Sequence, residues 1–145
     1  MKQNLLKGIL VTFILCLTNA HADYVLHSSE ANACMHLPGH WTGLGSASSW
    51  MVGTCVYRGV GTVSPISNNG VFTIEVTADK ESGSFICPSH ATEKLSGTCT
   101  NGLVTISTEY GSIGGHFSEN SGSAKGTVTV SPGVYADVDI EFQRQ

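Results

Sequence analysis

Period-two alternation of apolar and polar residues is the feature of this sequence that most restricts its fold. In the run 71–78, apolar residues of one parity alternate with Thr and Glu of the other, and the run 134–142 repeats the pattern. Successive side chains of a β-strand point to opposite faces, so each run predicts a strand with one buried face. We find no stretch with apolar residues at helical spacing that is long enough to predict a helix.

Turn-forming residues separate these runs at short intervals. Asn68-Asn69-Gly70, Asn101-Gly102, Asn120-Ser121-Gly122 and Pro132-Gly133 are typical of tight turns. The predicted strands are 38–43, 50–61, 71–78, 84–88, 95–100, 103–109, 113–118, 125–131 and 134–142. We predict an all-β, antiparallel meander of about eight strands that closes into a small barrel, because closure removes exposed edges. A β-sandwich is the alternative.

The N-terminal segment differs from the rest of the chain. Lys2 and Lys7 precede an apolar run at 8–17, and Ala20-His21-Ala22 follows. This order predicts a signal peptide over 1–22 and a secreted or periplasmic protein. The run is shorter than the roughly 20 residues that span a bilayer; an uncleaved anchor is the alternative. We expect a polar lead-in at 23–36 and one barrel domain at 37–145.

Charge limits the classes of partner. Without Lys2 and Lys7, five basic residues stand against eleven acidic ones, a net charge of −6. Nucleic acids and anionic membranes require basic patches, so neither is an expected partner. The chain has no N-x-S/T sequon, which favours a bacterial exported protein.

The cysteines predict covalent cross-links. Removal of the signal peptide leaves Cys34, Cys55, Cys87 and Cys99. An even number in an exported chain predicts two disulfides. Cys87 and Cys99 lie symmetrically about position 93, and a hairpin centred there would place them opposite each other. We therefore predict the pairs Cys34–Cys55 and Cys87–Cys99. Metal binding by the thiols is the alternative, although no C-x-x-C motif is present.

No pattern typical of catalysis is found. The sequence has no G-x-S-x-G, no H-E-x-x-H and no glycine-rich phosphate loop before a helix. We therefore expect a protein that is not an enzyme and has neither a cofactor nor a metal site.

The most distinctive stretch surrounds the first tryptophan. Cys34 is followed by Gly39-His40-Trp41-Thr42 and then by Leu44-Gly45-Ser46. Over about thirteen residues, with one-residue differences in spacing on either side of the tryptophan, this order resembles the start of avidin- and lipocalin-like calycin barrels. The resemblance implies a barrel with Trp41 near its closed end. It does not imply biotin binding, because the later aromatic residues that hold biotin in avidins are missing.

Two functions are consistent with these features. The first is a binding protein that acts through surface loops or a strand face on a protein partner, as an inhibitor or an envelope- or host-interacting factor. The alternative is a carrier of a small apolar ligand inside the barrel. The candidate binding residues are Trp41, Trp50, Tyr57, His40 and His116.

Overall fold

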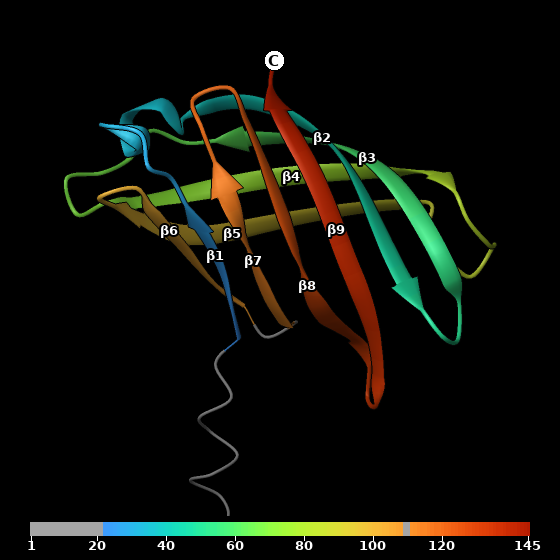
Figure 1. Ribbon diagram of the computed structural model, residues 1–145. Coiled ribbons are helices and arrows are strands. Elements are labelled where there is room, and N and C mark those ends of the chain that lie inside the picture. Colours follow the sequence, from blue (N-terminus) through green and yellow to red (C-terminus); the bar gives the residue numbers. More distant parts are fainter. Residues whose placement is uncertain (1–21, 109–110) are drawn as a thin grey trace, which may run out of the picture.

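The chain folds into a closed β-barrel (Figure 1). The computed structural model describes residues 22–108 and 111–145, so the predicted signal peptide lies almost wholly outside the described residues. The described residues form nine strands and one 3-10 helix. They are β1 (Ala22–His27), η1 (Ala33–His36), β2 (Gly39–Ser49), β3 (Gly53–Val63), β4 (Val71–Ser82), β5 (His90–Thr100), β6 (Leu103–Thr108), β7 (Gly111–Phe117), β8 (Ser121–Ser131) and β9 (Val134–Arg144).

Two antiparallel meanders make up most of the barrel wall. β2 to β6 pair in sequence, as do β7 to β9, and β9 pairs with β2. On the opposite side β1 lies between β6 and β7, antiparallel to β6 and parallel to β7. The strand nearest the N-terminus therefore closes the barrel, which Figure 1 shows as the blue strand between the orange and brown ones.

The prediction of an all-β barrel with two disulfides is confirmed, and the sandwich alternative is excluded. The strand count is nine, and the meander is interrupted between β6 and β7 by β1. The predicted strand 84–88 is wrong, because these residues form part of the loop between β4 and β5. The expected lead-in contains β1 and η1. β1 has only six residues and packs just Tyr24 and Leu26 against the core, so its alternation is too short to recognise.

The direction of the strands places the connections at two opposite ends. One end, the capped end, is covered by η1 and holds the connections 64–70, 101–102 and 118–120. At the other end, the described segments 49–54, 82–89 and 132–136 form what we call the rim. β1 enters the barrel from the rim side, because Ala22 pairs with Thr108 at the end of β6.

The main core lies toward the capped end. Trp41 is buried there, and its indole Nε1 donates a hydrogen bond to the Leu37 carbonyl oxygen (3.0 Å). Its ring meets Phe142 edge-to-face, with centroids 5.6 Å apart. The Arg144 guanidinium lies over the same ring at 4.5 Å and donates to the Pro38 carbonyl oxygen. These contacts close this end with an aromatic and cationic layer.

Glycines allow two aromatic rings to lie flat on neighbouring strands. A Cβ at Gly97 would lie 3.0 Å from the Cζ of Phe72, and one at Gly122 would lie 2.2 Å from the Cζ of Phe142. Each glycine is paired directly with the phenylalanine that covers it. The rings therefore shield backbone that has no side chain of its own.

The backbones of β7 and β8 approach each other closely at two glycines. A Cβ at Gly115 would lie 1.9 Å from the Ser123 carbonyl oxygen, and one at Gly126 would lie 2.0 Å from the Ser112 carbonyl oxygen. Only glycine permits the two backbones to approach this closely.

The disulfide pairing differs from the prediction. The bonds are Cys34–Cys99 and Cys55–Cys87. The predicted hairpin about position 93 does not exist, because that position lies within β5 and the turn is formed by 83–89. Cys87 precedes β5 and Cys99 lies near its far end, so roughly 30 Å of extended chain separates them. The first bond therefore ties η1 to the core, and the second ties β3 to the β4–β5 loop.

Candidate binding surface

Four large apolar side chains are exposed on two neighbouring connections of the rim. Trp50 and Met51 in the β2–β3 turn are 81% and 54% exposed, and Phe85 and Ile86 in the β4–β5 loop are 93% and 59% exposed. Scattered single apolar residues on a surface are normal, whereas a group at one end marks an interaction site. These four residues define the candidate surface.

The β2–β3 turn is held in shape by polar contacts at its base. The Val52 N–H donates to Ser49 Oγ (3.1 Å), and the hydroxyls of Ser48 and Thr54 share a hydrogen bond across the hairpin (2.8 Å). Gly53 has φ +79°, a conformation that glycine adopts without strain. The turn therefore presents Trp50 and Met51 from an ordered hairpin.

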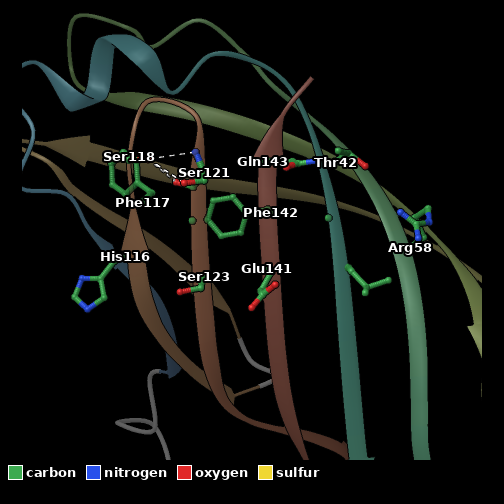
Figure 2. Close-up of a pocket in the computed structure, with 13 residues that line it drawn as sticks. Thr42, Arg58, His116, Phe117, Ser118, Ser121, Ser123, Glu141, Phe142 and Gln143 are labelled. Carbon is green, nitrogen blue, oxygen red and sulfur yellow. Dashed lines mark hydrogen bonds between the residues drawn. The ribbon is translucent and has the colours of Figure 1, made fainter.

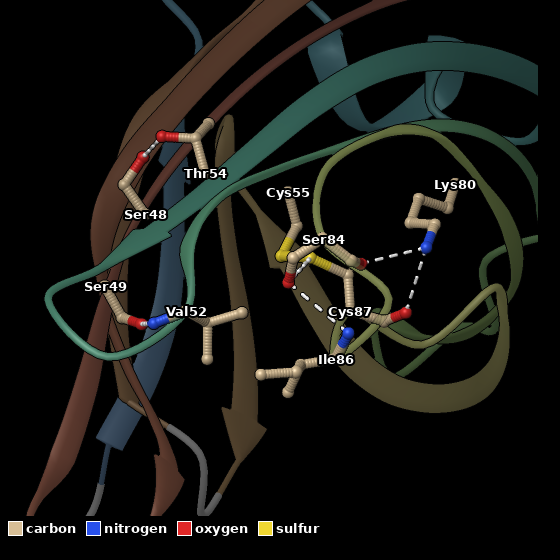
Figure 3. The surroundings of a disulfide bond; sticks show 9 residues. All are labelled: Ser48, Ser49, Val52, Thr54, Cys55, Lys80, Ser84, Ile86 and Cys87. Atoms are coloured by element: carbon tan, nitrogen blue, oxygen red, sulfur yellow. Dashed lines mark hydrogen bonds between the residues drawn. A yellow bond between two sulfur atoms is a disulfide. The ribbon is translucent and has the colours of Figure 1, made fainter.

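The β4–β5 loop is organised around the ammonium group of Lys80. Its Nζ donates to the carbonyl oxygens of Ser84 (3.0 Å) and Cys87 (3.3 Å), as Figure 3 shows. The Ile86 N–H donates to Ser84 Oγ (3.3 Å), and the Cys87 N–H donates to the Ser84 carbonyl oxygen (3.1 Å). These bonds fix the backbone on both sides of Phe85, so its exposure belongs to a structured loop.

The Cys55–Cys87 disulfide brings the two connections together. It joins the start of β3 to the loop, with the Cα atoms 6.0 Å apart (Figure 3). Gly83 (φ +124°) packs so closely that a Cβ there would lie 2.9 Å from the Thr54 carbonyl oxygen. The base of the β2–β3 hairpin and the β4–β5 loop are consequently held together. Such preorganisation lowers the entropy lost on binding.

Charged side chains are absent from the rim. The segments 49–54, 82–89 and 132–136 contain no Asp, Glu, Lys, Arg or His. The charged residues just behind the loop have partners within the chain: Glu81 pairs with Arg58, and Asp79 contacts the His90 ring. The tips of the two connections are therefore apolar and uncharged, and the Lys80 ammonium at the base of the β4–β5 loop is bonded to the carbonyl oxygens of Ser84 and Cys87.

Tyr135 extends this surface toward β9. It is 58% exposed and lies next to the β8–β9 turn. Ser48 pairs with Asp137, so the same register places Tyr135 at the level of Trp50 on the neighbouring strand. Three aromatic residues thus belong to the rim.

A concave feature, separate from the candidate surface, lies on the outer face of the barrel wall. The hollow has a volume of about 610 Å³ and is open to solvent (Figure 2). Its outward side chains come from β2, β3, β7, β8, β9 and the β7–β8 turn, and they are Thr42, Leu44, Arg58, His116, Ser118, Ser121, Ser123, Glu141 and Gln143. Leu44 is the one apolar member of this outward set. Phe117 and Phe142 also line the hollow, which therefore offers both hydrogen-bonding and apolar groups but is shallow and open to solvent.

The structure does not bring the five predicted binding residues together. Trp41 is buried at the capped end, and His40 lies exposed nearby with its Nδ1 3.2 Å from Thr62 Oγ1. Trp50 is at the rim. His116 is exposed on the outer hollow. Tyr57 is partly buried on the inward side of β3, where burial raises the pKa of its phenol. Of the five, Trp50 alone belongs to the candidate surface.

Phe85 and Ile86 were missed by the sequence analysis. Their apolar run favours a strand when it is considered alone. The neighbouring residues carry the opposite signal, because Gly83 and Pro88 enclose the run and are typical of a loop. An apolar run between such residues can indicate an exposed apolar loop as well as a buried strand.

Neither a membrane-spanning helix nor a metal-binding cluster is found in the part of the chain that the structure describes. Within residues 22–108 and 111–145, no helix has the length and apolar character needed to cross a membrane. No group of three or more His, Cys, Asp or Glu side chains in these ranges is placed to hold a metal ion. Comparisons of the chain with protein-family models, with curated proteins and with solved structures found no match.

Proposed function

We propose that this chain is an exported binding protein without enzymatic activity, and that the rim is its binding surface. The observation that carries the proposal is the placement of Trp50, Met51, Phe85 and Ile86, all more than half exposed, on two connections joined by the Cys55–Cys87 disulfide. Aromatic and long apolar side chains on a preorganised scaffold are typical of binding anchors. Export is supported by the N-terminal segment and by the two disulfides, which indicate an oxidising compartment.

Site-specific photo-crosslinking in the producing cell tests this proposal. A p-benzoylphenylalanine residue at position 50 or 85 places the reactive group at the rim, and the same residue at position 35 is the control. Met35 is 77% exposed and lies in η1 at the capped end. We expect defined adducts, to protein or to lipid, from the rim positions only. Equal labelling from position 35, or no adduct from the rim, would refute the proposal.

A second candidate function is the carriage of a small apolar ligand inside the barrel. Ala47 of β2 and Val138 of β9, which pair directly, are only partly buried. Native mass spectrometry of the unreduced exported protein tests this function. Additional mass from a bound small molecule supports carriage, and a bare protein mass contradicts it.

A further inference from the structure

We infer that the rim docks onto the surface of an electrically neutral, zwitterionic lipid membrane, with Trp50 and Phe85 entering the interfacial layer. This inference rests on the proposed function, because it names the partner of the same surface. Three features of the rim favour a lipid surface over a protein.

The first feature is the shape of the surface. Trp50 and Phe85 are 81% and 93% exposed because each projects from the tip of its own connection. Projecting tips can enter a fluid layer without a complementary surface on the partner. A protein partner would need pockets matched to both tips, since packing at protein interfaces is as dense as in protein interiors.

The second feature is the absence of charge. Protein interfaces are rich in Arg and have a polar outer ring, whereas the three rim segments contain no charged residue. Binding to anionic lipids requires clusters of Lys or Arg near the surface. Uncharged, apolar tips therefore fit neutral lipids best, because the residues of the tips carry no charge that has to be dehydrated when they enter.

The third feature is the kind of side chain. Trp and Tyr concentrate at the level of lipid headgroups, where an apolar ring and a polar N–H or O–H are both accommodated. Trp50 and the exposed Tyr135 supply such rings, and Phe85, Ile86 and Met51 supply apolar groups for the acyl region. The rim thus carries the residue types found at membrane interfaces.

Flotation with vesicles of pure phosphatidylcholine tests the inference, using the disulfide-bonded protein purified from the exported fraction. We expect the protein to float with the vesicles and to remain bound in about 1 M NaCl, because apolar insertion is not screened by salt. The chain has two tryptophans, one buried and one at the rim. Brominated phosphatidylcholine should therefore quench Trp50 emission and leave Trp41 emission unchanged.

Variants with matched chemistry locate the contact. Trp50→Ser and Phe85→Ser should each lower the vesicle partition coefficient about tenfold, because each removes most of one inserted apolar side chain. Met51→Ser should lower it less, because Met51 is only 54% exposed. Met35→Ser makes the same change at the capped end and should have no effect. All four side chains are more than half exposed, so the variants should fold, which near-UV circular dichroism checks.

Three results would overturn the inference: no flotation with phosphatidylcholine, binding that requires anionic phosphatidylglycerol and is lost in salt, or an equal loss in Met35→Ser. The crosslinking experiment separates this failure from that of the proposed function. If position 50 labels one protein while the vesicles do not bind, the rim is a protein-binding surface and the lipid inference is wrong. If neither occurs, both proposals fall.

Discussion

Removing the two disulfides one at a time should destabilise the barrel by different amounts. The perturbations are the double substitutions Cys34→Ala with Cys99→Ala, and Cys55→Ala with Cys87→Ala. Each deletes one cross-link and leaves the other in place. The first bond joins residues 65 apart in sequence, and the second joins residues 32 apart. The difference in loop length predicts the order of the two effects.

The magnitudes follow from the entropy that each cross-link removes from the unfolded chain. A loop of 65 residues corresponds to about 4.3 kcal/mol at 25 °C, and one of 32 residues to about 3.7 kcal/mol. Cys99 and Cys87 are 4% and 3% exposed, so each variant also loses a buried sulfur atom. Each truncation should leave a small void that adds about 1 kcal/mol. We expect losses of about 5.3 and about 4.7 kcal/mol, against a total stability on the order of 5–15 kcal/mol for a domain of this size.

Urea unfolding followed by tryptophan fluorescence measures both losses. Trp41 is buried and should report the transition, and far-UV circular dichroism provides an independent probe of the sheet. We expect the Cys34/Cys99 variant to have the lower urea midpoint. The reasoning would be refuted if the Cys55/Cys87 variant were the less stable one, or if either variant lost less than about 1 kcal/mol. Peptide mapping of the unreduced wild-type protein checks the pairing itself.

Three other predictions concern single side chains. Gly115→Ala should abolish folding or cost more than about 3 kcal/mol, because the new Cβ would meet the Ser123 carbonyl oxygen. Gly114→Ala is the control, because its new Cβ would have its nearest neighbour 4.0 Å away. Equal urea midpoints of the two variants would contradict the steric argument. Arg144→Met should cost about 2–3 kcal/mol in urea unfolding, because it removes two bonds to backbone carbonyls and a ring contact. Burial raises the pKa of the Tyr57 phenol in the folded protein. As pH rises, this phenol should therefore ionise first in the unfolded chain, and the free energy of unfolding should fall above about pH 10. Tyr57→Phe should lose less stability between about pH 9 and pH 11, and an unchanged pH dependence would show that Tyr57 does not contribute.

The alternation in the sequence was sufficient to predict strands and a closed barrel, because side-chain parity is a local property. The run 71–78 illustrates this: Phe72 is 1% exposed and lies within β4, as its parity requires. Strand order is not local. The placement of β1 between β6 and β7 joins residues far apart in the chain, and parity carries no information about which strands become neighbours.

The disulfide pairing shows how an error in one turn propagates. The prediction placed a turn at 91–94, whereas the chain turns at 83–89 and residues 90–100 form β5. That shift puts Cys87 in a loop beside Cys55 and moves Cys99 to the capped end, beside Cys34. The same shift concealed the rim, because Phe85 and Ile86 were assigned to the predicted strand 84–88 instead of a loop. The error left the predicted fold class unchanged, but it prevented the prediction of the candidate surface.

The two disulfides hold different parts of the small barrel in place. Cys34–Cys99 lies against the core at the capped end. Cys55–Cys87 lies outside that cluster, between two connections whose exposed side chains gain nothing from folding. Exposed apolar loops without a cross-link would be free to collapse onto the barrel mouth and hide their own side chains. A bond at their base keeps them extended, so the position of this disulfide is more readily explained by the display of the rim than by stabilisation of the core.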